Sequence, residues 1–156
     1  MNPVNSARKA LLIGYGNDLR GDDCAGRRVA EAIADCDIEN IEVRSVHQLT
    51  PDLAPLIAVS DLAIFADASA EPLDRDIRVR LLTPTAPAMD GAHSGSAAEL
   101  LGLSEWLYGK CPEAYAIDIF ATDFEFSLTP SPRTGAAIEA AIQCVHDLSS
   151  GNLGDY

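Results

Sequence analysis

The stretch ALLIGYGNDLRGDDCAGRRVAEAIA, residues 10–34, decides the fold of this chain. It opens on an apolar run at 10–13, which predicts a buried strand, and then enters the glycine-containing loop 14–17. From residue 22 to about residue 34, apolar side chains recur at helical spacing behind two acidic residues, where a helix dipole favours negative charge. The stretch therefore predicts a strand, a loop and a helix in that order.

The rest of the chain alternates strands and helices in the same way. Further strands are expected at residues 41–45, 62–66, 77–82 and 114–120, and further helices at residues 49–59, 97–108 and 133–148. The strand at 62–66 is wholly apolar, which is typical of a strand covered on both faces. We therefore expect an α/β fold: a three-layer sandwich with a mainly parallel, twisted, five-stranded sheet and helices on both faces.

Length and composition exclude several classes of protein. The 156 residues suit one domain over 1–156, with an ordered core from about residue 8 to residue 148 and a frayed C-terminal tail. The 11 Lys and Arg against 24 Asp and Glu give a net charge of −13, which would repel nucleic-acid phosphates. No apolar stretch reaches the roughly 20 residues that a membrane span needs. We expect a cytoplasmic protein that binds neither nucleic acid nor a membrane.

The four cysteines show no spacing typical of a zinc or redox site. They stand at positions 24, 36, 111 and 144, without a C-x-x-C pair. Isolated buried thiols are the simplest interpretation. Cys24 falls in the expected first turn of a helix, where the dipole can lower a thiol pKa, so a hydrolase that uses Cys24 and His93 stays open.

Side chains with metal-binding or catalytic chemistry follow several of the expected strands. In an open parallel sheet, ligands bind beyond the carboxyl ends of the strands, where the strand order reverses. Asp22 and Asp23 follow the first strand. Asp67 ends the third strand, and His93 lies in the loop before the helix at 97–108. Two carboxylates and one imidazole from separate loops would form a site for a divalent cation such as nickel or zinc, with positions open for further ligands.

Each of these residues also has a simpler structural interpretation. Asp22 or Asp23 can cap the helix that follows, because aspartate accepts hydrogen bonds from first-turn N–H groups. Asp67 can serve a turn, and His93 can be an ordinary loop histidine. The glycine loop does not match a dinucleotide-binding fingerprint, because Leu19 stands where the third glycine is needed.

Four segments together resemble the hydrogenase maturation proteases, which trim the C-terminal extension from the large subunit of [NiFe] hydrogenases. The segments are LLIGYGNDLRGDDCAGRRVAEAI at 11–33, IFADAS at 64–69, AHSGSAAELL at 92–101 and IDIFATDFEFSLTPSP at 117–132. The resemblance runs from about residue 8 to residue 148. It implies an endopeptidase that recognises nickel already inserted in the precursor large subunit, which is its protein partner.

The resemblance also implies a set of site residues. The family's three metal-contacting positions fall on Asp23, Asp67 and His93, and the nickel would be that of the precursor. The first position is often glutamate in the family and is aspartate here, and Cys24 stands where glycine is common. Asp23 and Asp67 are also the candidates for the catalytic base.

The loop and one alternative complete the set of expectations. Gly14, Gly16 and Asn17, with Tyr15 among them, should shape the floor of the cleft. A protein of another class, an acidic adaptor that senses nickel without cutting, would use the same residues. These residue types do not by themselves separate a peptidase from such an adaptor.

Overall fold

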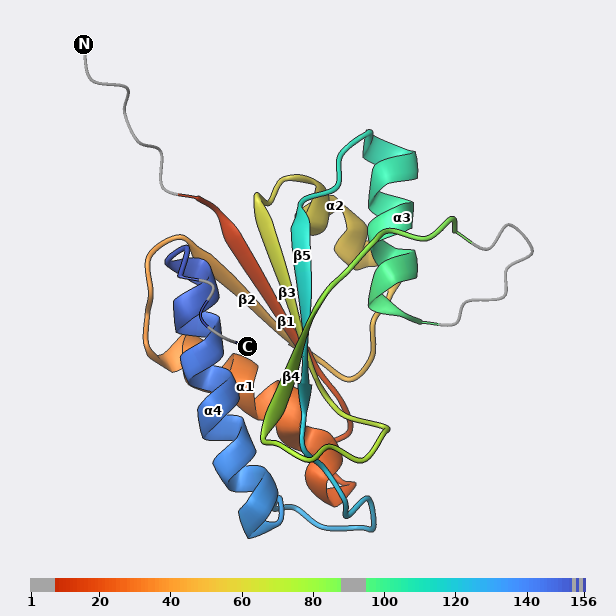
Figure 1. Ribbon diagram of the computed structural model, residues 1–156. Coiled ribbons are helices and arrows are strands. Elements are labelled where there is room, and N and C mark those ends of the chain that lie inside the picture. The colour runs from red at the N-terminus through yellow and green to blue at the C-terminus, as the bar shows by residue number, and fades with distance from the viewer. Residues whose placement is uncertain (1–7, 88–94, 153, 155) are drawn as a thin grey trace.

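The computed structural model describes residues 8–87, 95–152, 154 and 156, and its described strands form one sheet (Figure 1). The sheet has five strands in the order β2-β1-β3-β5-β4. β4 runs antiparallel to β5, and the other neighbours are parallel. The strand bounds are β1 Ala10–Tyr15, β2 Ile41–Val46, β3 Leu62–Ala68, β4 Ile77–Leu81 and β5 Glu113–Ile119.

Helices cover both faces of the sheet, which confirms the three-layer sandwich. Figure 1 shows α1 and α4 on one face and α2 and α3 on the other. The α-helices are α1 Ala25–Asp35, α2 Ala54–Ala58, α3 Ala97–Tyr108 and α4 Pro132–Ser149. Two 3-10 turns, η1 Gly21–Cys24 and η2 Pro51–Leu53, lead into α1 and α2. Among the helices within the described ranges, none is long and apolar enough to cross a membrane.

Alternate residues of the inner strands fill two hydrophobic clusters, because successive side chains of a strand point to opposite faces. Leu12 and Ile64 belong to the cluster between the sheet and α1 and α4. Leu11 and Phe65 belong to the cluster between the sheet and α2 and α3. The apolar runs predicted as strands are thus buried on both sides.

The contact of α1 with the sheet depends on glycine. A Cβ atom at Gly14 would lie 2.0 Å from the Gly26 carbonyl oxygen, and one at Gly26 would lie 2.1 Å from the Ala66 carbonyl oxygen. Both approaches are closer than a methyl group allows, so larger residues would push α1 off β1 and β3. This contact fixes where the loop after β1 leaves the sheet.

Several predicted boundaries differ from the structure. β1 and β3 extend to Tyr15 and Ala68, because they stay paired with β2 and β5 to their ends, and Asp67 therefore lies within a strand. The helix expected at 49–59 is η2 followed by the five-residue α2. The first turn of the helix expected from residue 22 is the separate 3-10 turn η1.

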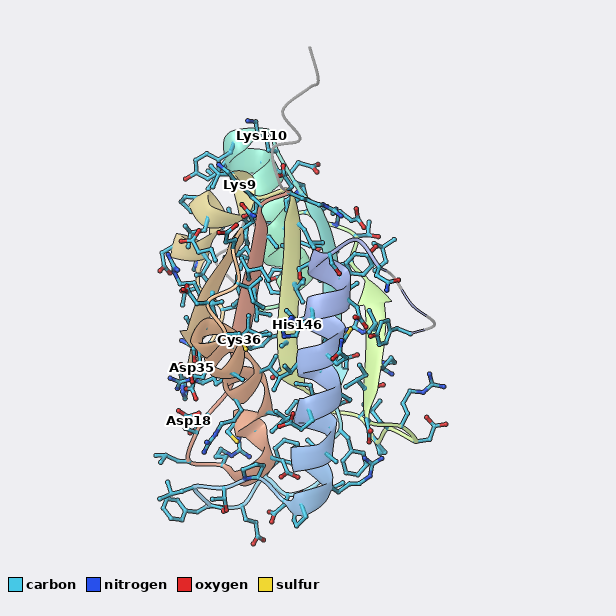
Figure 2. The ribbon with its side chains drawn as sticks, turned by 90° about the vertical axis from the view of Figure 1, so that its left-hand side faces the viewer. Lys9, Asp18, Asp35, Cys36, Lys110 and His146 are labelled. Atoms are coloured by element: carbon cyan, nitrogen blue, oxygen red, sulfur yellow. The ribbon has the colours of Figure 1, made fainter. Side chains whose placement is uncertain are left out.

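Different charged side chains lie at the two ends of the sheet. Figure 2 shows Lys9 and Lys110 at the end where the parallel strands begin, and Asp18 at the end where they finish. Asp18 belongs to the loop between β1 and η1, and Arg27 of α1 forms an ion pair with it at 3.1 Å. The carboxyl end of the sheet is the end at which ligands bind in open α/β folds.

Candidate functional site

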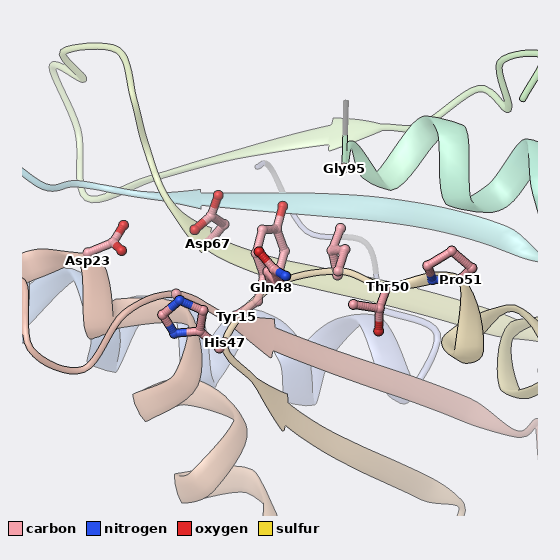
Figure 3. A pocket seen from close by; sticks show the side chains of 10 residues that line it. Tyr15, Asp23, His47, Gln48, Thr50, Pro51, Asp67 and Gly95 are labelled. Atoms are coloured by element: carbon pink, nitrogen blue, oxygen red, sulfur yellow. The ribbon is translucent and has the colours of Figure 1, made fainter. Parts of the chain in front are cut away.

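A cleft of about 530 Å³ lies at the carboxyl ends of β1, β2 and β3. Figure 3 shows side chains from these three strand ends around it, with Gly95 at the start of the segment that leads into α3. The lining residues are Tyr15, Gly16, Asp23, His47, Gln48, Leu49, Thr50, Pro51, Asp67 and Gly95. The cleft thus brings Asp23 and Asp67, which are 44 residues apart in the sequence, to one wall.

Asp23 comes from η1 and is held by the glycine loop. The backbone N–H of Asn17 donates to its carboxylate at 2.9 Å. Gly16 has φ of +146°, and a Cβ atom there would lie 2.0 Å from the Asp23 carbonyl oxygen, so only glycine fits. Of the three predicted loop residues, Gly16 lines the cleft, Asn17 holds Asp23, and Gly14 packs under α1.

Asp67 is the most perturbed carboxyl group in the cleft. Burial and the negative charges of Asp23 and Asp118 raise its pKa to about 7. The Ala68 N–H and the Tyr15 hydroxyl donate to its carboxylate and offset part of the rise. Asp67 therefore takes up and releases its proton near neutral pH.

Tyr15 is the direct neighbour of Asp67. Burial and the charge of Asp67 raise the pKa of the Tyr15 phenol, so the hydroxyl stays protonated and acts as a donor. It comes from the end of β1, where the register of the parallel sheet sets it beside Asp67 on β3. Tyr15 thus orients one oxygen of the carboxylate within the cleft.

Asp118 stands opposite Asp67 in the pairing of β3 with β5, but its charge is neutralised. Arg80 donates to both of its carboxylate oxygens, at 2.7 and 3.1 Å, and Arg78 donates at 2.9 Å. Burial opposes ionisation of Asp118, yet these two guanidinium groups hold its pKa below the usual range. The edge strand β4 therefore keeps Asp118 charged and paired, in contrast to Asp67.

Asp22 does not line the cleft and does not cap α1, although capping was one interpretation of its position. It is fully buried, and its carboxylate accepts hydrogen bonds from the chain that follows β5. The backbone N–H groups of Thr122, Asp123 and Ser131 donate at 3.0, 3.0 and 2.7 Å, and the Ser131 hydroxyl donates at 3.0 Å. Burial opposes ionisation of Asp22, but these donors lower its pKa to about 2. Asp22 is thus an anchor for the loop between β5 and α4.

Cys24 is a buried thiol, in agreement with the simplest interpretation of the sequence. Its side chain is 0% exposed, and burial raises the pKa of the thiol above its ordinary value. The helix dipole does not make this thiol acidic, because the thiol is buried in the core instead of facing solvent at the helix start. A hydrolase that uses Cys24 is not supported by this environment.

The third predicted metal contact, His93, lies outside the described residues, as does the segment 88–94 that contains it. Within the part of the chain that the structure describes, no group of three His, Cys, Asp or Glu side chains is placed to hold a metal ion. The described cleft supplies two carboxylates, which is a donor set that divalent cations bind. A cation between Asp23 and Asp67 would relieve the repulsion that raises the pKa of Asp67.

His47 is a cleft residue that sequence reasoning missed. It is the first residue after β2, and its ring lies between the side chains of Asp23 and Gln48 in the view of Figure 3. The signal was present in the sequence, because His47 comes two residues after the expected strand at 41–45, and Asp67 comes one residue after the expected strand at 62–66.

Comparisons with known proteins agree with this fold. No family model and no curated protein sequence matches the chain. A [NiFe] hydrogenase maturation protease HycI from Thermococcus kodakarensis KOD1 has a similar structure, with a TM-score of 0.72 and 17% identity over 94% of this chain and 95% of its own. The hydrogenase maturating endopeptidase HybD from E. coli has a TM-score of 0.72 and 20% identity over 92% of this chain and 94% of its own.

A third solved structure extends the likeness to another archaeal protein. A hydrogenase 2 maturation peptidase from a Thaumarchaeota archaeon has a TM-score of 0.68 and 22% identity, over 93% of this chain and 99% of its own. The chain therefore has the fold of the hydrogenase maturation proteases over nearly its whole length, as the sequence resemblance implied. At these identities the likeness concerns the fold.

Proposed function

We propose that this protein is an endopeptidase that removes the C-terminal extension from the precursor of a [NiFe] hydrogenase large subunit after nickel insertion. The observation that carries the proposal is the cleft carboxylate pair, in which Asp67 lies half-buried beside Asp23 and has a pKa of about 7. The solved structures with the same fold are named as proteases or peptidases of hydrogenase maturation, which supports the same reaction for this chain.

The nickel belongs to the precursor and is part of the substrate. In this proposal Asp23 and Asp67 contact it with their carboxylates, and His93 adds an imidazole. Oxygen and nitrogen ligands of this kind suit a borderline divalent cation. Contact with the metal would place the neighbouring peptide bond in the cleft, which is a positioning effect and converts recognition of nickel into alignment for cutting.

The cleft residues also suit the hydrolytic step. A carboxylate in the cleft can accept a proton from an attacking water, although contact with the nickel lowers the pKa of Asp67 below its value of about 7 in the chain alone. Asp67 and Asp23 are the candidates for this base, and the Tyr15 hydroxyl holds Asp67 in orientation. All four cysteines are free thiols, which fits a protein that works in the reducing cytoplasm.

The test is a reaction with two purified proteins, this chain and a nickel-loaded precursor large subunit. Mass spectrometry should show a large subunit shortened at its C-terminus, and an Asp67→Asn variant should leave it full length. A protein that binds the nickel-loaded precursor but never shortens it would be the non-cleaving adaptor, and that outcome would refute the peptidase.

A further inference from the structure

One imidazole among the described residues lies in the cleft, and it comes from a strand that the proposed site does not use. β2 ends at Val46, beside the end of β1, and the Gly16 N–H donates to the Val46 carbonyl at 3.3 Å. The backbone that leads into His47 is therefore tied to the glycine loop that holds Asp23. His47 then lines the same cleft as Asp23 and Asp67 (Figure 3).

No structural task accounts for this side chain in the part of the chain that is described. The His47 side chain is exposed, and among the described residues it makes no hydrogen bond or ion pair. The other described histidine, His146, lies on α4, on the face of the sheet that α1 also covers, and it does not line the cleft (Figure 2). His47 is thus the described imidazole that can meet a substrate in the cleft.

Peptide hydrolysis needs a proton donor as well as a base. The oxygen of water bonds to the carbonyl carbon, the C–N bond breaks, and the nitrogen must gain a proton because an amine leaves poorly as an anion. An ionised carboxylate that contacts a cation carries no proton at the start of the reaction, and it becomes a donor only after it has taken one from the water. Imidazole both gives and accepts protons near neutral pH, which suits the remaining role.

We propose that His47 is the general acid of the cleft and protonates the nitrogen of the scissile peptide bond as that bond breaks. This inference rests on the proposed peptidase function. One proton of the attacking water passes to a cleft carboxylate, and a ring N–H of protonated His47 gives its proton to the leaving amine. The carboxylate then returns its proton to the imidazole through solvent. In balance, one water is consumed, and the carboxyl and amino products are released.

The test compares His47→Ala and His47→Gln with the wild-type chain on nickel-loaded precursor. General acid catalysis is worth typically about 10²–10⁴-fold, so kcat should fall by at least about 100-fold in both variants. The affinity for the precursor should stay within about twofold, because nickel contact is assigned to other residues. Added imidazole should raise the rate of His47→Ala by about tenfold or more, since the side chain is exposed and leaves an open site.

Two controls make the result specific. His146→Ala should cleave like the wild type, and the wild-type reaction in the same imidazole solution shows whether the additive disturbs the nickel of the substrate. Circular dichroism confirms that each variant is folded. A His93→Ala variant should lose precursor affinity, whereas the His47 variants should not.

The outcomes separate this inference from the function on which it rests. If the wild type trims the precursor and His47→Ala trims it within about threefold of the same rate, the general-acid role is wrong while the peptidase stands. Loss of precursor affinity in His47→Ala, or a slow variant that imidazole does not rescue, also overturns proton donation. If the wild type does not trim at all, the proposed function itself fails.

Discussion

Asp22 and Asp23 are neighbours in the chain, yet they serve two regions with opposite electrostatics. Asp22 is the centre of the loop anchor, which comprises Asp22 and the three donor residues Thr122, Asp123 and Ser131. Its fully buried carboxylate accepts four hydrogen bonds, and its pKa is about 2. In the cleft, Asp67 lies near the carboxylates of Asp23 and Asp118. It accepts fewer hydrogen bonds than Asp22 does, and its pKa is about 7.

The comparison shows that burial alone does not say what a carboxylate does. Burial opposes ionisation at both Asp22 and Asp67, but only Asp22 has enough donors to reverse the effect. At neutral pH the ionised Asp22 carboxylate therefore stabilises the folded state, whereas ionisation of Asp67 in the cleft destabilises it. Titratable groups with strongly perturbed pKa values, such as Asp67, are concentrated at functional sites.

The largest effect is expected from removing charge in the cleft. Asp67→Asn and Asp23→Asn should each reduce the trimming rate by roughly 1,000-fold or more, because each substitution removes a proposed nickel contact and a candidate base. His93→Ala should have an effect of the same order. Mass spectrometry of the precursor measures the rate, and circular dichroism checks that the fold is intact. Full activity in any two of these variants would contradict the assignment of these residues to the nickel-contacting site.

The next effect is on stability and belongs to the loop anchor. Asp22→Ala should lower the free energy of unfolding by about 3 kcal/mol or more, because four donors lose their acceptor in a buried place. Thermal or urea unfolding at pH 7 measures it. The trimming rate per folded molecule should fall far less than in Asp67→Asn. Equal loss of rate with unchanged stability would mean that Asp22, and not its neighbour, belongs to the reaction.

Stability against pH distinguishes the two regions directly. The folded-state pKa of Asp67, about 7, lies above its unfolded value, so its contribution is fully present at low pH and is lost as pH rises through about 7. Asp67→Asn should therefore be more stable than the wild type at pH 8, by roughly 1–2 kcal/mol, and should lose that advantage near pH 4. Urea unfolding at both pH values is the measurement. If the Asp67→Asn variant were less stable than the wild type at pH 8, ionisation of Asp67 would not destabilise the folded protein, and the prediction would be wrong.

The contribution of Asp22 to stability changes with pH in the opposite direction to that of Asp67. Its folded pKa lies below the unfolded value, so its stabilisation is present above about pH 4 and is lost as pH falls through about 2. The Asp22→Ala variant should therefore lack the acid-induced part of unfolding that the wild type shows in that range.

The smallest effect on activity is expected at Cys24. Cys24→Gly restores the residue that is common in the resembled family, and the buried thiol is not reactive, so trimming should stay within about twofold of wild type. The lost packing should cost about 1–2 kcal/mol of stability. Turnover assays check the first statement and urea unfolding checks the second, while thiol labelling of the folded wild-type protein tests whether Cys24 is reactive. Labelling of Cys24 with parallel loss of turnover would revive a cysteine hydrolase.

Local signals predicted much of the fold. The helix at 97–108 has the predicted bounds because Ser96 accepts a hydrogen bond from the Glu99 N–H, and Gly109 ends the helix with φ of +68°. Strand ends were predicted less well, because pairing with a neighbour carried β3 past Asp67, and pairing is not visible in one segment.

The site was predictable only where it depends on strand ends. That rule found Asp67 and the acidic pair, but the choice between Asp22 and Asp23 rests on donors about 100 residues away in the chain. No local pattern contains such a contact. His47 lies just past the end of β2 and lines the same cleft, so the rule that ligands bind beyond strand ends also points to it.

The central claim is that the cleft of Asp23 and Asp67 acts only on a precursor that carries nickel. The direct measurement takes two matched samples of precursor large subunit, one nickel-loaded and one stripped, and incubates each with the wild-type protein before mass spectrometry. We predict a C-terminally shortened large subunit in the loaded sample and a full-length one in the stripped sample. Equal trimming of both samples would contradict it, because the cleft would then cut without the metal that it is proposed to recognise.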